Sequence, residues 1–299
     1  IGGDGADTLD GGLGNDSLDG GLGIDRVSYA FATGGVAVNL GNPGGQNTLQ
    51  AGVDKLVSIE ELEGSAFNDT FSGGTGADLL IGLDGHDTLN GGDGNDTLIG
   101  GLGNNSIDGG ADFDWVHYES AITSVNVNLA INRADYFTPG GAPNADSLLS
   151  IEGVAGTQGN DAIVGDAFAN VLLGLAGNDG VSGGGGNDSI QGGEGNDVLA
   201  GDGGNDTIYG GSGNDYINGG DGVNALFGEE GDDLMTFDGI LDYAWSGTGH
   251  DRLFFSIDDY DGKAAINDFD LWDDTLLFDG STSGGFSASL AFSFTQSIS

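Results

Sequence analysis

A nine-residue repeat limits the folds open to this chain. From Gly2 the sequence runs GGDGADTLD, GGLGNDSLD and GGLGIDRVS: two glycines, a variable residue, a third glycine, another variable residue, an aspartate, and a large apolar residue at the eighth position. The pattern returns from Gly73 to His117 and from about Gly159 to Thr236. Such a unit cannot bury its apolar side chain alone, so the repeats are predicted to stack into a solenoid.

The register holds throughout the repeats. All 18 eighth positions are large and apolar, from Leu9 to Met235. The sixth position is Asp in 15 repeats, namely Asp7, Asp16, Asp25, Asp69, Asp78, Asp87, Asp96, Asp114, Asp161, Asp179, Asp188, Asp197, Asp206, Asp215 and Asp233. It is Asn in three repeats, at Asn105, Asn170 and Asn224. Chance composition does not produce this placement.

The spacing indicates a cation site. Carboxylates and backbone carbonyls are the oxygen ligands that Ca²⁺ accepts together. Glycines let the backbone turn through positive φ and bring its carbonyls close to an ion. The last three residues of each repeat suit a very short strand with one inward apolar side chain. We therefore predict multiple Ca²⁺ ions bound by the sixth-position aspartates.

The charge of the chain supports this prediction. Asp and Glu total 48 against five Lys and Arg, a formal net charge of −43, which opposes a compact state unless cations neutralise it. An acidic, Gly-rich disordered chain is the alternative, but the 37% of apolar residues are strictly placed. Nucleic acid is excluded as a partner because it needs a basic footprint. The five basic residues all avoid the fourth to sixth repeat positions.

Other classes are limited by what the sequence lacks. With no cysteine there is neither a disulfide framework nor a thiolate metal site, so metal ions are the expected staple. No apolar run approaches the roughly 20 residues that span a bilayer, so no membrane span is expected. The sequence opens inside a repeat without a signal peptide, so we expect a piece of a longer protein.

These repeats resemble those of the RTX (repeats-in-toxin) proteins, whose consensus is GGxGxDxUx with U large and apolar. The resemblance implies an all-β fold, a parallel β-roll or right-handed β-solenoid, in which two repeats make one coil and Ca²⁺ lies between turns 18 residues apart. Nine fully acidic pairs follow: Asp7/Asp25, Asp69/Asp87, Asp78/Asp96, Asp96/Asp114, Asp161/Asp179, Asp179/Asp197, Asp188/Asp206, Asp197/Asp215 and Asp215/Asp233. Weaker sites are expected at the three asparagines.

Two insertions interrupt the repeats and match each other. GGVAVNL and DKLVSIEELEGSAFND in the first correspond to TSVNVNL and DSLLSIEGVAGTQGND in the second. Alternating apolar residues at 36, 38 and 40 and at 125, 127 and 129 predict a strand in each. A flap covering the roll is favoured over a surface for partner contacts.

After Thr236 the repeat is expected to stop, and a β-rich cap to cover the last coil. Residues 266–278 resemble the segment that closes serralysin-type C-terminal domains. Residues 280–299 carry no charge, and alternation between 286 and 294 predicts a strand that is also a candidate secretion signal. The predicted organisation is repeat blocks at 1–28, 67–117 and 159–236, insertions at 29–66 and 118–158, and a cap at 237–299.

No active site is predicted. His86, His117 and His250 lie far apart in sequence and form no zinc motif, and there is neither a GxSxG elbow nor a cysteine nucleophile. We expect a secreted, calcium-folded part of a cell-surface or structural protein: an adhesin, an S-layer-like lattice or a matrix component.

The runner-up is the C-terminal secretion and folding domain of a larger protease, lipase, epimerase or toxin. An ice-binding solenoid is disfavoured, since the third positions form no regular threonine row. The resemblance further implies export from a Gram-negative bacterium by a type I secretion machinery, and the expected contacts include the cell surface, a matrix polymer or other protein subunits.

Overall fold

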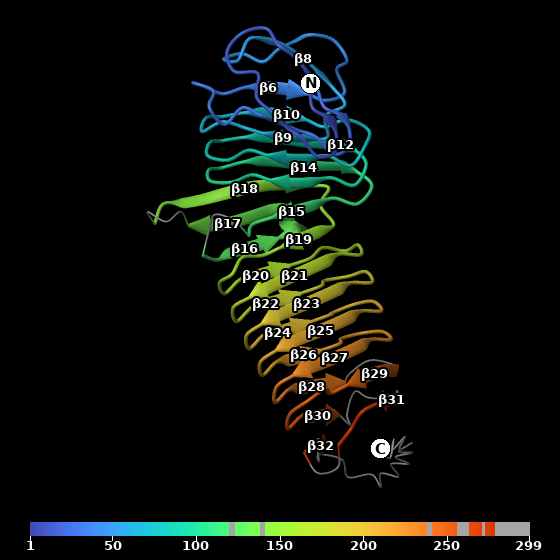
Figure 1. Ribbon diagram of the computed structural model, residues 1–299. Helices are drawn as coiled ribbons and strands as arrows, with labels where there is room; N and C mark the ends of the chain where they lie inside the picture. The colour runs from blue at the N-terminus through green and yellow to red at the C-terminus, as the bar shows by residue number, and fades with distance from the viewer. Residues whose placement is uncertain (120–122, 138–140, 238–240, 256–262, 271–272, 279–299) are drawn as a thin grey trace.

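The chain forms a long stack of coils that runs from the N-terminus at one end to β32 (Thr275–Phe278), the last described strand, at the other (Figure 1). The structure is a computed structural model that describes residues 1–119, 123–137, 141–237, 241–255, 263–270 and 273–278. The predicted strand between residues 286 and 294 and the candidate secretion signal lie outside the described residues.

One wall of the stack is a 13-stranded sheet that runs the whole length of the coils. Its strands, in spatial order, are β2 (Thr8–Leu9), β5 (Arg26–Ser28), β9 (Glu61–Glu63), β11 (Leu79–Ile81), β13 (Thr97–Ile99), β15 (Trp115–His117), β19 (Gly153–Ala155), β21 (Val171–Ala176), β23 (Ser189–Glu194), β25 (Thr207–Ser212), β27 (Ala225–Glu230), β29 (Leu241–Trp245) and β31 (Lys263–Ile266). All neighbouring strands in this sheet are parallel.

The opposite wall is a 14-stranded sheet. Its strands are β32 (Thr275–Phe278), β30 (Arg252–Phe255), β28 (Leu234–Phe237), β26 (Tyr216–Asn218), β24 (Val198–Ala200), β22 (Gly180–Ser182), β20 (Ala162–Val164), β16 (Val125–Asn128), β17 (Arg133–Phe137), β18 (Pro143–Leu149), β14 (Ser106–Ala111), β12 (Thr88–Asp93), β10 (Thr70–Ser72) and β6 (Ala37–Asn39). Two small sheets pair β1 (Gly3–Asp4) with β4 (Gly21–Leu22), and β3 (Ser17–Asp19) with β8 (Val53–Val57) and β7 (Gln46–Asn47). A 3-10 helix, η1 (Leu129–Ile131), follows β16.

Strands pair with an offset of 18 residues, so two repeats make one coil. Ile190 on β23 pairs with Ile208 on β25, which pairs with Leu226 on β27. Each short strand has its eighth-position residue buried and its neighbours more exposed, and the buried residues of both sheets form one core. The predicted all-β parallel β-roll is confirmed.

Glycine is required at Gly195, the fourth position of its repeat, by both conformation and space. Gly195 has φ +135°, and a Cβ on it would lie 1.5 Å from the carbonyl oxygen of Gly177 in the neighbouring coil. Successive coils therefore approach too closely at this turn for any side chain. The repeat keeps glycine where backbone meets backbone.

Both insertions are built into the walls instead of forming separate flaps. In the first, β9 completes the 13-stranded sheet, with Leu62 paired to Val27 and Leu80, and β6 pairs with β10. In the second, β19 does the same, and the antiparallel strand β17 joins β16 to β18 in the other sheet. The strands predicted from the alternation in each insertion are present as β6 and β16.

The predicted end of the repeat at Thr236 is wrong. Strands β29 and β30 pair in parallel with β27 and β28 at the same 18-residue offset, and β31 and β32 add to them. Ala244 and Leu253 are fully buried at eighth positions. The roll continues because apolar eighth positions persist after most of the glycines have gone.

Candidate calcium ladder

The sixth-position side chains form a row along each edge of the roll. In all nine predicted pairs, the carboxylate Oδ1 of the later aspartate accepts a hydrogen bond from the backbone N–H of the earlier one, at 2.7–2.9 Å. The donor and acceptor residues are one coil apart. Stacking of the coils therefore brings together every pair that the spacing predicted.

The second oxygen of most of these carboxylates has no protein donor. Within the described part of the chain, Oδ2 is buried and without a hydrogen-bond partner in Asp7, Asp16, Asp25, Asp87, Asp96, Asp114, Asp179, Asp188, Asp197, Asp206, Asp215, Asp233 and Asp251. A buried charged oxygen without a partner is costly, whereas a hard cation would satisfy it. The residues present therefore fit Ca²⁺.

First-position glycines keep the space beside this oxygen open. A Cβ on Gly82 would lie 2.3 Å from Oδ2 of Asp87 and 2.6 Å from the carbonyl oxygen of Gly100 in the next coil. The same arrangement recurs at Gly192, with Asp197 and Gly210 at 2.3 and 2.6 Å. A carboxylate oxygen and a carbonyl oxygen thus lie close to one another, as ligands of a hard cation must.

Burial and mutual repulsion oppose ionisation of this row. Burial, and then the charges of neighbouring carboxylates, raise the pKa of Asp87, Asp179 and Asp233 to about 7. The same causes raise the pKa of Asp206 and Asp215 to about 6. Among the described residues no Lys, Arg or His contributes to these shifts, so a bound cation is the natural source of compensation.

Side chains alone do not complete a metal site. Across the described ranges, no three His, Asp or Glu side chains gather closely enough to hold a metal ion. Any cation in the ladder must take further oxygens from the turn carbonyls, as Ca²⁺ does in flexible loops.

All three asparagines carry an Nδ2 donor where an aspartate carries a second oxygen, and that of Asn170 donates to the carbonyl oxygen of Glu152 at 3.4 Å. Asn224 accepts the N–H of Asp206 at 2.9 Å, as an aspartate would, but its Nδ2 donates to the carbonyl oxygen of Gly220 at 3.2 Å. Asn105 makes the same pair of bonds, to Asp87 and Gly101. An N–H group thus replaces the free oxygen, and weaker sites at these positions stay a prediction.

Three predicted aspartates already have donors on Oδ2. The backbone N–H groups of Ser65, Gly74 and Thr157 donate to Asp69, Asp78 and Asp161 at 2.5–2.6 Å. These carboxylates can bind an ion only through the oxygen lone pairs that the N–H donors leave free.

Four acidic residues of the insertions extend the ladder, and the sequence pattern did not reveal them. Asp54 and Asp146 accept the N–H groups of Asp16 and Asn105, at 3.0 and 2.8 Å. Glu60 and Glu152 do the same for Asp25 and Asp114, at 3.0 and 2.9 Å. The match between the two insertions could have revealed them, because Asp54 and Glu60 in the first correspond to Asp146 and Glu152 in the second.

The ladder also runs beyond Thr236. Asp242 accepts the N–H of Asn224 at 3.0 Å, and Asp251 accepts that of Asp233 at 2.9 Å. Both are buried, and burial first raises the pKa of Asp251 to about 6. Both residues follow Asp233 at the nine-residue spacing of the repeat, and this spacing could have revealed them in the sequence.

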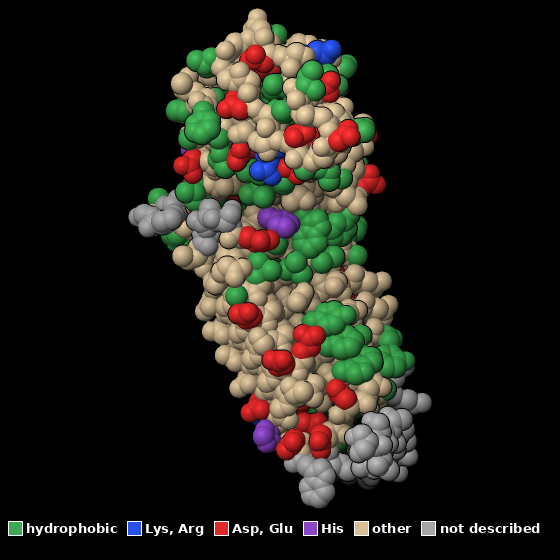
Figure 2. All heavy atoms as spheres, viewed as in Figure 1, with side chains coloured by type: hydrophobic (Ala, Val, Ile, Leu, Met, Phe, Trp, Pro, Cys, Tyr) green, Lys and Arg blue, Asp and Glu red, His purple; other side chains and the backbone are tan. Residues whose placement is uncertain are grey.

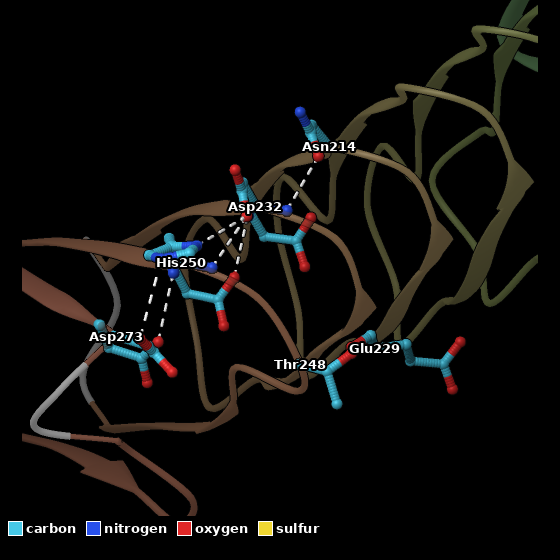
Figure 3. A network of polar contacts seen from close by, with 9 residues as sticks. Asn214, Glu229, Asp232, Thr248, His250 and Asp273 are labelled. Carbon is cyan, nitrogen blue, oxygen red and sulfur yellow. Dashed lines mark hydrogen bonds and ion pairs between the residues drawn. The ribbon is translucent and has the colours of Figure 1, made fainter.

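A second ladder lies on the exposed side of the turns, at the fifth position that the repeat left variable. Polar side chains at this position accept the backbone N–H of the fifth residue one coil later, as the side chain of Asn178 accepts from Asn196 at 2.7 Å. Figure 3 shows its C-terminal end, where Asn214 accepts from Asp232 at 2.8 Å and Asp232 accepts from His250 at 2.9 Å. The many asparagines at this position were the signal.

The surface agrees with a cation-dependent roll. Figure 2 shows acidic side chains spread over the length of one face, with the few basic ones toward its N-terminal end. Apolar side chains on this face gather over β25, β27 and β29. These strands carry three stacked rings, with centroid distances of 4.7 Å between Tyr209 and Phe227 and 4.4 Å between Phe227 and Trp245. Among the described residues, no helix is long and apolar enough to cross a membrane.

Comparison with known proteins bears on the ladder directly. The model of the RTX calcium-binding nonapeptide repeat (4 copies) matches residues 1–27, 63–98, 81–116, 155–190, 182–217, 191–226 and 201–235, more than half of the chain. Comparison with curated proteins found no match.

Among solved structures, the extracellular lipase LipA from Serratia marcescens is similar at 20% identity over 68% of this chain, with a TM-score of 0.23. The matched region spans 36% of that lipase structure.

Proposed function

The chain belongs to the family of RTX calcium-binding nonapeptide repeats and binds several Ca²⁺ ions, and on this premise we propose that it is a secreted β-roll whose folding is driven by extracellular Ca²⁺. The observation that carries the proposal is the row of buried Oδ2 atoms without a hydrogen-bond donor in the described part of the chain.

The residues of the ladder have separate tasks. In the nine acidic pairs, Oδ1 of the later aspartate fixes the register of two coils by accepting a backbone N–H, as in Asp197 and Asp215. Oδ2 and the turn carbonyls would hold the ion, which when bound supplies positive charge between two carboxylates. Because the paired oxygens exist only when coils are stacked, binding stabilises the folded state alone.

Concentration then decides where the chain folds. Extracellular calcium modules bind with dissociation constants of roughly 10⁻⁴–10⁻³ M. Inside a cell, where free Ca²⁺ is far lower, a chain of charge −43 stays expanded and exportable. Outside, ion binding removes the repulsion and the roll forms.

We propose that this chain serves a cell-surface or structural protein of a Gram-negative bacterium, exported by a type I secretion machinery, with the cell surface, a matrix polymer or other protein subunits as contacts. The duplicated block and insertion support this, because repeated units build length. We assign this chain no catalytic role. Its histidines have structural partners: His86 accepts from Asn104, and His117 and His250 lie beside Glu119 and Asp232.

Circular dichroism of the full chain tests the central claim. The far-UV spectrum should change from disordered in excess EDTA to β-rich in millimolar Ca²⁺. Equal Mg²⁺ should not reproduce this, since Mg²⁺ demands a near-octahedral shell and dehydrates reluctantly. NaCl of matched ionic strength controls for screening. The same β content in EDTA as in Ca²⁺ would sink the proposal.

The proposed location needs a separate test. Fractionation of the source bacterium with an antibody against this chain should place it on the cell surface. Recovery only from the culture medium, together with an enzymatic activity on the same polypeptide, would contradict the surface role and favour the domain of a secreted enzyme or toxin.

A further inference from the structure

Each insertion carries a buried cluster of hydroxyl and carboxylate groups in line with the calcium ladder. In the second insertion, Asp146 takes the place of a sixth-position aspartate, and its Oδ1 accepts the N–H of Asn105 at 2.8 Å. Its Oδ2, however, accepts from the hydroxyl of Tyr118 at 3.1 Å. The tyrosine satisfies the oxygen that regular coils leave without a protein donor.

A second tyrosine meets the turn carbonyls of the same coil. The hydroxyl of Tyr136 lies 3.0 Å from the carbonyl oxygen of Gly101, 2.6 Å from that of Gly103 and 3.3 Å from Oδ1 of Asp146. Both tyrosines and Asp146 are buried. One hydroxyl thus sits where a carboxylate and two turn carbonyls converge, the set of oxygens that a hard cation would otherwise collect.

The first insertion repeats the arrangement with different hydroxyls. Oδ1 of Asp54 accepts the N–H of Asp16, at 3.0 Å. The Thr48 hydroxyl lies 3.0 Å from Oδ2 of Asp54 and 3.0 Å from the carbonyl oxygen of Gly52, and the Tyr29 hydroxyl lies 3.3 Å from the same Oδ2. Asp54 is 1% exposed and Thr48 fully buried.

The two clusters correspond in sequence as well as in space. Tyr29 and Tyr118 each follow a sixth-position aspartate by four residues, and Asp54 and Asp146 open the matching segments DKLVSIE and DSLLSIE. The duplication therefore preserved a hydroxyl donor for each of these two carboxylates.

We propose that Asp54 and Asp146 bind no calcium, because protein hydroxyls occupy the place of the ion, and that each of these carboxylates is a metal-independent junction on its own edge of the calcium ladder. This inference rests on the proposed function, since it requires the regular coils to bind Ca²⁺. Its consequence is that this edge of the ladder loads as separate segments on either side of Asp54 and of Asp146.

The test compares two buried carboxylates on the same edge of the roll. Asp87 and Asp146 flank Asn105 along one row, and both accept a backbone N–H through Oδ1. Only Asp87 leaves Oδ2 without a donor among the described residues. Bound Ca²⁺ ions are counted by native mass spectrometry and calorimetric titration for the full chain and for Asp87→Asn, Asp54→Asn and Asp146→Asn.

Asp87→Asn should lose at least one ion and need more Ca²⁺ to fold, whereas Asp54→Asn and Asp146→Asn should keep the ion count of the unmodified chain. A loss in Asp146→Asn equal to that in Asp87→Asn would overturn the inference. An unmodified chain that binds no Ca²⁺ would instead refute the proposed function, so the two failures are distinguishable.

Tyrosine variants keep the test decisive if an asparagine variant fails to fold. Tyr118→Phe and Tyr136→Phe remove only a hydroxyl and leave every carboxylate in place. Both should keep the ion count and lower resistance to urea by the same amount at low and high Ca²⁺. A destabilisation that changes with Ca²⁺ concentration would show that the hydroxyls act through a bound ion, and would contradict the inference.

Discussion

Replacing Asp197 with asparagine should destabilise the roll only to the extent that calcium is present. Asp197 is buried, and its Oδ1 accepts the N–H of Asp179 at 2.8 Å. An amide can take over that bond, as Asn224 does at 2.9 Å in its own coil. What asparagine cannot supply is the charged Oδ2, which lacks a donor in the described part of the chain.

The size of the effect follows from the binding equilibrium. A site with a dissociation constant of roughly 10⁻⁴–10⁻³ M stabilises the folded state by about 1.4–2.7 kcal/mol at about 10 mM Ca²⁺. Loss of one site should remove that amount. Without Ca²⁺ the sign reverses, because burial raises the pKa of Asp197 and a neutral amide removes an unfavourable buried charge.

Urea unfolding followed by far-UV circular dichroism measures the calcium-dependent part of this effect. The difference between Asp197→Asn and the unmodified chain should grow as Ca²⁺ rises from about 0.1 to about 10 mM. Asp221→Asn is the matched control, since it removes one charge from an exposed third position. An equal destabilisation at all Ca²⁺ concentrations would refute the reasoning, because it would assign Asp197 a purely structural role.

Three further predictions concern protons and backbone geometry. Without Ca²⁺, lowering the pH from about 7.5 to about 5 should increase β content, because pKa values such as that of Asp179, about 7 in the fold, exceed the ordinary carboxyl value and favour the protonated folded state. This stability is complete below the unfolded pKa and is lost as the pH rises through 7, and a loss of β signal on acidification would contradict it. Gly195→Ala should cost more than about 4 kcal/mol in urea unfolding, since φ is +135° and its Cβ would strike backbone. Gly180→Ala, whose Cβ would meet nothing closer than 4.0 Å, should stay within about 1 kcal/mol, and similar losses in both variants would argue against the close stacking of coils. Glu229→Gly should stabilise the roll by roughly 0.5 kcal/mol because Glu229 has φ +75°, with Glu229→Gln as the charge control and an equal gain in both variants as the contrary result.

The repeat by itself determined that the chain stacks into a solenoid. A unit with one apolar side chain at the eighth position has to stack, and stacking at a constant period places equal positions above one another. The number of repeats in one coil, and with it the pairing of Asp179, Asp197 and Asp215, came from the resemblance to RTX repeats, and the structure joins these residues through backbone N–H groups. Local rules sufficed because every neighbour lies a fixed distance along the chain.

The tertiary structure decided what happens where that distance changes. Asp146 reaches Asn105 across 41 residues, and Asp54 reaches Asp16 across 38, so no constant spacing could pair them. Their partners depend on how each insertion folds back onto the roll, with Tyr118 and Tyr29 carried to the same carboxylates. The sequence determined which carboxylates line the edges of the regular coils. Only the packed insertions showed which carboxylates receive a hydroxyl.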